Sequence, residues 1–174
     1  MAFRRFKAAV AAASVGLCAG LVAAVAGAAP AHAANCMDGA LYSLGAKKYV
    51  TAELGYTGTG YGMLRARATS VGDWERFEFC YESGTSGGML SIRSLANNRW
   101  VTVETGYTGV DNGMLRASST SVGTKQYFWA WNGGLNSDAN GKYATAELSY
   151  TGARLGMLRS RATTAGPWEK YEIR

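Results

Sequence analysis

Residues 49–78 read YVTAELGYTGTGYGMLRARATSVGDWERFE, and this stretch decides the fold because the chain contains it three times. The block returns over residues 100–129 and 143–172 with no insertion inside any copy. Eleven of its thirty positions hold the same residue in all three copies. They are Thr51/Thr102/Thr145, Glu53/Glu104/Glu147, Tyr56/Tyr107/Tyr150, Thr57/Thr108/Thr151, Gly58/Gly109/Gly152, Gly62/Gly113/Gly156, Met63/Met114/Met157, Leu64/Leu115/Leu158, Arg65/Arg116/Arg159, Thr69/Thr120/Thr163 and Gly72/Gly123/Gly166. The chain is therefore an internal triplication.

Apolar residues alternate at period two at the start of each block, which indicates β-strands. In the first copy Val50 and Ala52 face one way, and Thr51 and Glu53 are predicted to face outward. Each repeat holds about four short strands separated by Gly, Asn and Ser turns, and no amphipathic helix is predicted after residue 34. Three such units predict an all-β protein with the β-trefoil fold. Six strands would close a barrel and three hairpins would cap it, which removes exposed sheet edges.

The first 33 residues have the pattern of a secretory signal peptide. A basic start at Arg4-Arg5 precedes an uncharged, alanine-rich run over residues 8–29, and Ala31-His32-Ala33 resembles a cleavage site. We therefore predict an extracellular protein whose mature part, residues 34–174, is a single domain without membrane insertion. The three repeat units are expected at about residues 37–83, 84–132 and 133–174.

The mature part has little charge and few reactive groups. Three of the 18 Lys and Arg residues lie in the predicted signal, which leaves 15 against 12 acids, a net charge of +3. Because no basic run stands out, we expect no nucleic-acid partner. The only histidine, His32, precedes the mature part, which therefore has no imidazole for acid–base catalysis or metal binding. We expect no metal, no cofactor and no enzymatic activity.

Two cysteines remain in the mature part, Cys36 and Cys80. In an exported chain they predict a disulfide. It would close a loop of about 45 residues and stabilise the fold by roughly 3–4 kcal/mol in the chain-entropy picture.

The first and third repeats resemble the signature of fascin-like β-trefoils. That signature runs Gly-Lys-Tyr-hydrophobic-small-Ala-Glu and, later in the unit, Gly-x-Trp-Glu-x-aromatic. The matching segments are Lys48–Glu53, Gly72–Phe77, Gly141–Glu147 and Gly166–Glu172. The second repeat departs from it, with Arg99-Trp100 and Thr124-Lys125-Gln126-Tyr127-Phe128 at these places. The Gln-x-Trp signature of ricin-type lectin trefoils is absent from every unit.

The resemblance implies a β-trefoil and a binding role. In the animal proteins that name the family, four trefoils together bundle actin filaments, and a single exported domain does not imply that activity. Secreted bacterial members look like accessory binding modules, for which sugars are the ligands usually considered. Because fold alone does not determine function, the candidate site has to come from the residues themselves.

Four triplicated residues are candidate ligand-binding residues. Glu and Arg on neighbouring strands form either a repeated cross-strand ion pair or a polar clamp for a sugar hydroxyl. Tyr and Thr on the loop between these strands form either a turn whose ring folds back onto the barrel or an aromatic platform for a sugar ring. The candidates are Glu53, Glu104, Glu147, Arg65, Arg116, Arg159, Tyr56, Tyr107, Tyr150, Thr57, Thr108 and Thr151.

Other prominent residues have structural interpretations. Trp74, Phe77, Trp168 and Tyr171 are expected in the core or the barrel cap. The three methionines of the repeats are expected to fill core space. The acidic pairs Glu75/Glu78 and Glu169/Glu172 are predicted to lie on a solvated strand face rather than to form a glycosidase dyad.

These observations predict a secreted, non-catalytic module that binds polysaccharide or glycan through up to three equivalent sites. The alternative is a protein-binding trefoil, an inhibitor of an extracellular enzyme or an adaptor in a secreted complex. That alternative would use the stretches where the repeats differ, Glu82–Gly88 and Lys125–Asn132, with Trp129 and Trp131 as contact residues.

Overall fold

The structure, a computed structural model, describes residues 35–83 and 88–174. All described residues belong to one compact unit. The predicted signal peptide, residues 1–33, lies outside the described residues. The described ranges contain thirteen strands, six short 3₁₀ helices and no α-helix. None of the helices described there is long and apolar enough to cross a membrane.

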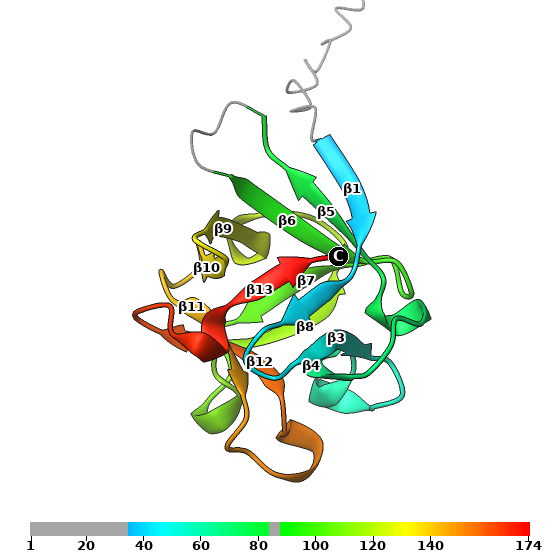
Figure 1. Cartoon of the computed structure of the whole chain (residues 1–174), viewed down its shortest axis with the longest axis vertical. Helices are drawn as coiled ribbons and strands as arrows, with labels where there is room; N and C mark the ends of the chain where they lie inside the picture. Colours follow the sequence, from blue (N-terminus) through cyan, green and yellow to red (C-terminus); the bar gives the residue numbers. More distant parts are fainter. Residues whose placement is uncertain (1–34, 84–87) are drawn as a thin grey trace, which may run out of the picture. The chain divides into compact units, whose positions relative to one another are not determined.

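The first and last strands of the three repeats form a closed barrel (Figure 1). Its first strand is interrupted at Ala40, so that one part pairs with β5 and the other with β13. β5, β6, β9 and β10 pair in that order, and a bridge between Gly134 and Lys170 joins β10 to the segment entering β13. The barrel strands are β1 (Asn35–Gly39), β2 (Leu41–Ser43), β5 (Phe77–Tyr81), β6 (Met89–Ser94), β9 (Tyr127–Trp131), β10 (Gly134–Ser137) and β13 (Tyr171–Ile173).

The two middle strands of each repeat form a hairpin, and the three hairpins meet around a pseudo-threefold axis. Each hairpin pairs with the next one, through Met63 opposite Arg116, Met114 opposite Arg159 and Met157 opposite Arg65. The hairpins are β3 (Lys48–Glu53) with β4 (Met63–Ala68), β7 (Arg99–Glu104) with β8 (Met114–Ser119), and β11 (Tyr143–Glu147) with β12 (Met157–Ala162). A six-stranded barrel capped by three hairpins is the predicted β-trefoil.

A glycine at the start of the second hairpin strand allows this close approach. Gly62, Gly113 and Gly156 have φ of +75°, +81° and +76°, and each accepts a 2.7 Å backbone hydrogen bond from the next hairpin. A Cβ atom at Gly62 would lie 2.5 Å from the carbonyl oxygen of Ala117. Any larger residue would therefore be strained by its backbone angle and would also push the hairpins apart. This explains why all three repeats keep glycine here.

Apolar side chains of all three repeats fill the barrel in one cluster. Val50, Leu64 and Phe77 of the first repeat are each 1% exposed or less, as are their counterparts Val101 and Leu115 in the second. The three repeat methionines are buried too, but they form a second cluster on the axis, with tyrosines packed against them. The disulfide between Cys36 and Cys80 is formed and ties β1 to β5, as predicted.

The predicted outward face of the first hairpin strand is in fact covered. Thr51 and Glu53 are 0% and 2% exposed, and Thr145 and Glu147 are buried to the same degree. The reason is that a 3₁₀ helix from the end of the same repeat packs on this face. These helices are η2 (Asp73–Glu75), η4 (Thr124–Gln126) and η6 (Pro167–Glu169), which contact β3, β7 and β11 respectively.

The same helices correct two further expectations. Phe77 and Tyr171 lie in the core as predicted, but Trp74 and Trp168 are 38% and 39% exposed because they sit on the outer side of η2 and η6. Glu75 and Glu169, expected on a solvated strand face, are 8% and 7% exposed. Each carboxylate turns inward, where it accepts a 2.8 Å hydrogen bond from the backbone N–H at the start of its helix.

Candidate functional site

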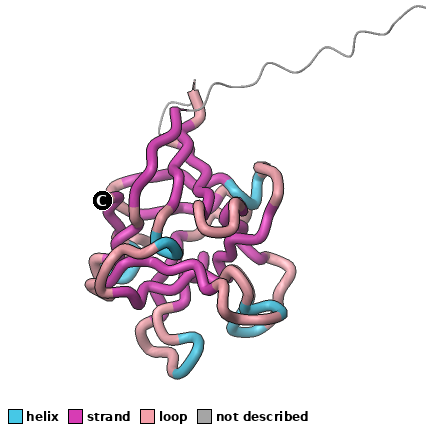
Figure 2. The backbone as a smooth tube through the Cα atoms, turned by 90° about the vertical axis from the view of Figure 1, so that its right-hand side faces the viewer, coloured by secondary structure: helices cyan, strands magenta, loops and turns pink. Residues whose placement is uncertain are grey.

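Three loops join the strands of the cap hairpins, and we name them the cap loops (residues 54–62, 105–113 and 148–156). Each contains one 3₁₀ turn, drawn in cyan in Figure 2. The turns are η1 (Gly58–Gly60), η3 (Gly109–Asp111) and η5 (Gly152–Arg154). Gly58, Gly109 and Gly152 have φ between +57° and +60°, so the Tyr-Thr-Gly turn uses glycine for a left-handed backbone.

The threonine before each turn is exposed and leaves its hydroxyl available. Thr57, Thr108 and Thr151 occupy the N-cap position, where Ser and Thr side chains commonly bond a backbone N–H. In all three turns that side-chain bond is absent. The same hydroxyl group is thus presented to solvent at three equivalent places.

The repeated arginines hold the cap loops to one another. Arg65 donates from Nη1 to the hydroxyl oxygen of Tyr56 at 2.6 Å and reaches the third repeat, where Nη2 donates to the carbonyl of Leu155 at 2.8 Å. Arg116 bonds Tyr107 in its own repeat, and its Nε donates to the carbonyl of Tyr61 at 3.0 Å in the first. Arg159 completes the cycle.

The third arginine follows the same pattern. It bonds the hydroxyl of Tyr150 at 3.0 Å, and its Nε donates to the carbonyl of Asn112 at 2.6 Å in the second repeat. Each arginine thus ties its own tyrosine to the preceding cap loop around the axis. The guanidinium groups serve as internal crosslinks of the cap.

The repeated glutamates lie beneath this cycle. Glu53 pairs with Arg65 at 3.4 Å and with Arg67, and Glu104 pairs with Arg116 at 3.1 Å. Glu147 pairs with Arg161. The predicted pairing of the Glu and Arg candidates is therefore found in the first two repeats, whereas in the third repeat Glu147 pairs with Arg161 in place of Arg159. The predicted site residues do come together in space, but the threonines and the tyrosine rings are the members that line open surface.

That open surface consists of three shallow grooves, one beside each repeated tyrosine. Their volumes are about 390, 320 and 370 Å³. Each is lined by the Tyr and Thr of one cap loop, by the residue before that Tyr, by the end of its own 3₁₀ turn, and by one residue of a neighbouring loop. Groove 1 is Gly55, Tyr56, Thr57, Gly60 and Ala153; groove 2 is Gly106, Tyr107, Thr108, Asp111 and Thr59; groove 3 is Ser149, Tyr150, Thr151, Arg154 and Val110.

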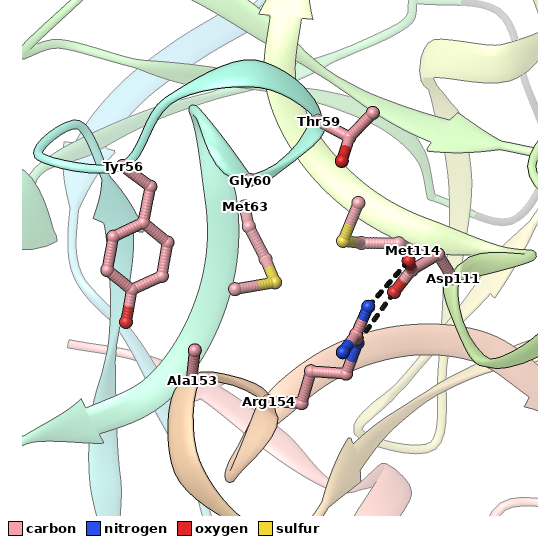
Figure 3. Close-up of a pocket in the computed structure, with 8 residues that line it drawn as sticks. All are labelled: Tyr56, Thr59, Gly60, Met63, Asp111, Met114, Ala153 and Arg154. Carbon is pink, nitrogen blue, oxygen red and sulfur yellow. Dashed lines mark hydrogen bonds and ion pairs between the residues drawn. The ribbon is translucent and has the colours of Figure 1, made fainter.

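A smaller cavity of about 150 Å³, the central pocket, lies between the cap loops (Figure 3). Met63 and Met114 point their thioether groups toward it, and the ring of Tyr56 and the methyl group of Ala153 stand at its side. Thr59, Gly60, Asp111 and Arg154 complete the lining. The pocket therefore combines apolar walls with one ion pair.

The ion pair joins the second and third cap loops. Arg154 donates from Nε and Nη2 to the two carboxylate oxygens of Asp111 at 2.9 and 2.8 Å. These hydrogen bonds lower the pKa of the Asp111 carboxyl and raise the pKa of the Arg154 guanidinium. Both side chains stay partly exposed, at 25% and 49%, so they can contact a ligand as well as each other.

Sequence reasoning missed the residues that distinguish the grooves. Gly60, Asp111 and Arg154 occupy equivalent places, as do Thr59, Val110 and Ala153, and these places differ between repeats. Because they are not identical, repetition alone does not reveal them. The signal that could have found them is their location between an invariant Thr-Gly and an invariant Gly-Met, in a loop of constant length.

The residues predicted for the alternative function lie on the barrel strand β9. Trp131 is 66% exposed, and the indole N–H of half-buried Trp129 donates to Asp138 at 3.2 Å. Residues 84–87 of the other divergent stretch lie outside the described ranges. The possible metal-ligating atoms of Cys36, Glu78 and Cys80 lie within 4.8 Å of one another. Both sulfurs, however, are held in the disulfide.

Comparison with known proteins places the fold but no family. No protein-family profile and no curated protein sequence matches the chain. Among solved structures, the chain is similar to the designed threefold-symmetric protein ThreeFoil, with a TM-score of 0.60 and 17% identity over 78% of this chain and 96% of that one. It is also similar to the agglutinin of Rhizoctonia solani, with a TM-score of 0.59 and 11% identity over 80% of this chain and 94% of that one.

A third similar structure belongs to a larger protein. The exo-β-1,3-galactanase 1,3Gal43A from Clostridium thermocellum matches with a TM-score of 0.59 and 13% identity, over 78% of this chain and 29% of that one. At these identities the likeness concerns the fold alone. The fold is a β-trefoil, and the fascin-like subtype stays a prediction.

Proposed function

We propose that this protein is a secreted, non-catalytic glycan-binding module that uses the three cap grooves. The observation that carries the proposal is the repetition, in all three grooves, of a tyrosine ring next to an exposed threonine hydroxyl that caps no backbone group. An aromatic ring supplies an apolar surface with a polar end, and the hydroxyl both donates and accepts hydrogen bonds. Together they suit a sugar ring, which has apolar C–H faces and hydroxyl edges.

Open grooves suit weak, repeated binding. The three grooves are too shallow to surround a ligand, so the affinity of each for a short oligosaccharide is expected to be low. The arginine crosslinks hold the three cap loops to one another. A polymer that reaches two or three grooves would bind more tightly than a monomer, because the second contact becomes intramolecular.

The names of two similar structures support this proposal. Two similar structures are described as an agglutinin and an exo-β-1,3-galactanase, and the second name is that of an enzyme that acts on a carbohydrate. The non-catalytic part rests on the groove lining, where Asp111 is the one carboxylate among the described lining residues and is bound to Arg154. The secreted part rests on the signal-like start and on the disulfide.

The test uses two matched sets of threonines. The purified, disulfide-bonded protein is screened against insoluble polysaccharides and soluble glycans, and binding is then measured for the triple variant Thr57→Val, Thr108→Val, Thr151→Val. Its control is the triple variant Thr69→Val, Thr120→Val, Thr163→Val, which removes three exposed hydroxyls at repeated positions outside the grooves. Tyrosine substitutions are less suitable because each tyrosine hydroxyl also holds a crosslinking arginine.

The groove variant is expected to lose about fivefold in affinity for a short oligosaccharide, from one lost hydrogen bond per site of about 1 kcal/mol, and more for a polymer. The control variant should bind like the wild type. Equal binding by both variants would contradict the use of the grooves. A folded wild-type protein that binds none of the glycans would contradict the proposed function.

One observation favours a second candidate, docking of a secreted protein on the barrel. Trp131 is the most exposed large hydrophobic residue among the described residues, and exposed aromatic residues are common anchors of interfaces. Under this alternative, Trp131→Ser would abolish association with a partner from the organism's own secreted proteins. The groove triple variant would leave that association unchanged.

A further inference from the structure

The three grooves differ in their access to the central pocket. Groove 1 shares Tyr56, Gly60 and Ala153 with that pocket, whereas groove 2 shares Thr59 and Asp111 and groove 3 shares Arg154. Gly60 places no side chain between the two spaces. The equivalent residues of the other repeats are Asp111 and Arg154, whose side chains extend into this region and bind each other (Figure 3). Groove 1 and the central pocket therefore form one continuous site.

The chemistry of the pocket differs from that of the grooves. Met63 and Met114 are 4% and 2% exposed and, with Ala153, give the pocket an apolar wall. At the rim, the guanidinium of Arg154 offers N–H donors and the carboxylate of Asp111 offers acceptors within one ion pair. At about 150 Å³ against 390 Å³ for groove 1, the pocket suits a substituent of a sugar rather than a second ring.

We propose that groove 1 and the central pocket together bind a sugar residue that carries an acetamido group, an N-acetylhexosamine within a glycan. This inference rests on the proposed function and names the ligand class of one of its three sites. The sugar ring would lie in groove 1 beside Tyr56 and Thr57. The acetamido methyl would contact the thioethers of Met63 and Met114, its carbonyl would accept from Arg154, and its N–H would donate to Asp111.

An acetamido group matches this pocket better than a hydroxyl or a carboxylate does. A hydroxyl would make no apolar contact with the thioether groups of Met63 and Met114. A carboxylate would be repelled by Asp111 while it competed for Arg154. The acetamido group has one methyl, one donor and one acceptor, and the pocket offers a counterpart for each. In grooves 2 and 3 the place of Gly60 is taken by Asp111 and Arg154, whose side chains bind each other, so those grooves should not distinguish acetylated sugars.

The test compares two ligands that differ only at C2. Chitopentaose carries an acetamido group where cellopentaose carries a hydroxyl, and each is titrated into the purified, disulfide-bonded protein. We expect chitopentaose to bind at least tenfold more tightly. The variant Gly60→Asp, which installs the residue of the second repeat, should remove that preference, so that the two pentasaccharides bind with equal affinity.

Gly60→Asp is compatible with the fold. The backbone of Gly60 does not have a positive φ, and a Cβ there would lie 3.4 Å from Cδ2 of Tyr56, an ordinary contact that narrows the passage. Its matched control is Gly106→Asp, which places the same charge in groove 2 at a position with open space around it and should keep the preference. Thermal unfolding of both variants confirms that each is folded.

A second measurement locates the acetamido methyl. In protein labelled with ¹³C at the methionine methyl groups, chitopentaose should shift the signals of Met63 and Met114, while Met37 on β1 and Met89 on β6 serve as internal controls. Equal affinities for the two pentasaccharides, or unchanged Met63 and Met114 signals, would overturn this inference while the glycan-binding function stands. Failure to bind any glycan would overturn both.

Discussion

The first and third repeats, which we call the outer repeats, and the middle repeat hold the same glutamate in different surroundings. Glu53 and Glu147 have side chains that are 3% and 1% exposed, whereas that of Glu104 is 17% exposed. The difference follows from one residue. Arg67 and Arg161 each donate two hydrogen bonds to the glutamate of their repeat. The middle repeat has Ser118 at the equivalent place, and it donates one hydrogen bond to Glu104 at 3.2 Å.

This contrast shows what allows a carboxylate to be buried in the cap. A charged group is removed from water at low cost only when partners neutralise it and satisfy its oxygens. The outer repeats meet that condition with a bidentate arginine, whereas the glutamate of the middle repeat is more exposed to solvent. Identical residues at equivalent places in the repeats therefore contribute different amounts to the free energy of unfolding.

The largest expected effect comes from breaking the outer ion pairs. Glu147→Gln should lower the free energy of unfolding by about 3 kcal/mol, because the buried carboxylate loses its charge and with it two charge-assisted hydrogen bonds from Arg161. Glu104→Gln should cost about 1 kcal/mol, since its carboxylate is more exposed. Guanidinium denaturation followed by tryptophan fluorescence measures both values.

The converse substitution sharpens the same comparison. Ser118→Arg gives the middle repeat the arginine of the outer ones. In this background, the loss of unfolding free energy caused by Glu104→Gln should come closer to the loss caused by Glu147→Gln. Equal losses for the two Glu→Gln variants would show that the second arginine does not determine the energetic weight of the buried carboxylate.

A smaller effect is expected from the threonine beneath each hairpin. Thr51 donates to the buried carboxylate of Glu75 at 2.7 Å, Thr102 accepts from Gln126 at 2.8 Å, and the hydroxyl of Thr145 is buried with no hydrogen-bond partner among the described residues. Thr51→Val should cost about 2 kcal/mol, because a bond to a charged acceptor is lost, and Thr102→Val about 1 kcal/mol.

The third member of this series should behave in the opposite way. Thr145→Val replaces an unpaired buried hydroxyl by a methyl group of similar volume, so it should leave stability unchanged or increase it slightly. The same denaturation experiment ranks all three variants. A loss at Thr145 as large as that at Thr51 would contradict the hydrogen-bond assignment.

The smallest effect concerns the ion pair between the second and third cap loops. The pKa of Asp111 is lowered by its hydrogen bonds to Arg154, so the pair stabilises the fold above the ordinary aspartate pKa of about 3.9. That contribution disappears as the pH falls through the lowered pKa of the folded state. Both side chains are partly exposed to solvent, which screens the pair, so the contribution should stay within about 0.5 kcal/mol.

Stability profiles of wild type and Asp111→Asn measure this contribution. The two curves should differ slightly near neutral pH and converge in acid. A difference that grows on acidification would have the wrong sign for a carboxylate whose pKa is lowered.

Much of the fold could be predicted because the repeats share residues that only one geometry explains. The glycines at the hairpin junctions, the period-two strands and the two cysteines define four strands per unit, the trefoil and the disulfide. The outward placement of Thr51 and Glu53 was wrong for a physical reason. Strand periodicity separates two faces but does not show that a 3₁₀ helix later in the same repeat covers the second one.

The candidate site was less predictable because it depends on contacts between repeats. Tyr56 and Thr57 are singled out by their repetition in the sequence, but the groove beside them is completed by Ala153 from the third repeat. Likewise, the arginines looked available for a ligand because the carbonyls they bond lie about 50 or 90 residues away in the sequence. Such partners follow from the closure of three hairpins around an axis, which periodicity alone does not reveal.

The central claim is that the cap grooves, rather than the barrel around Trp131, bind the ligand. Its most direct test is a backbone amide NMR titration of the isotope-labelled protein with a glycan that binds in the screen. The account predicts that the signals of Tyr56–Thr57, Tyr107–Thr108 and Tyr150–Thr151 shift together while those around Trp131 stay in place. Shifts confined to β9 and its neighbours, with unchanged cap loops, would contradict it.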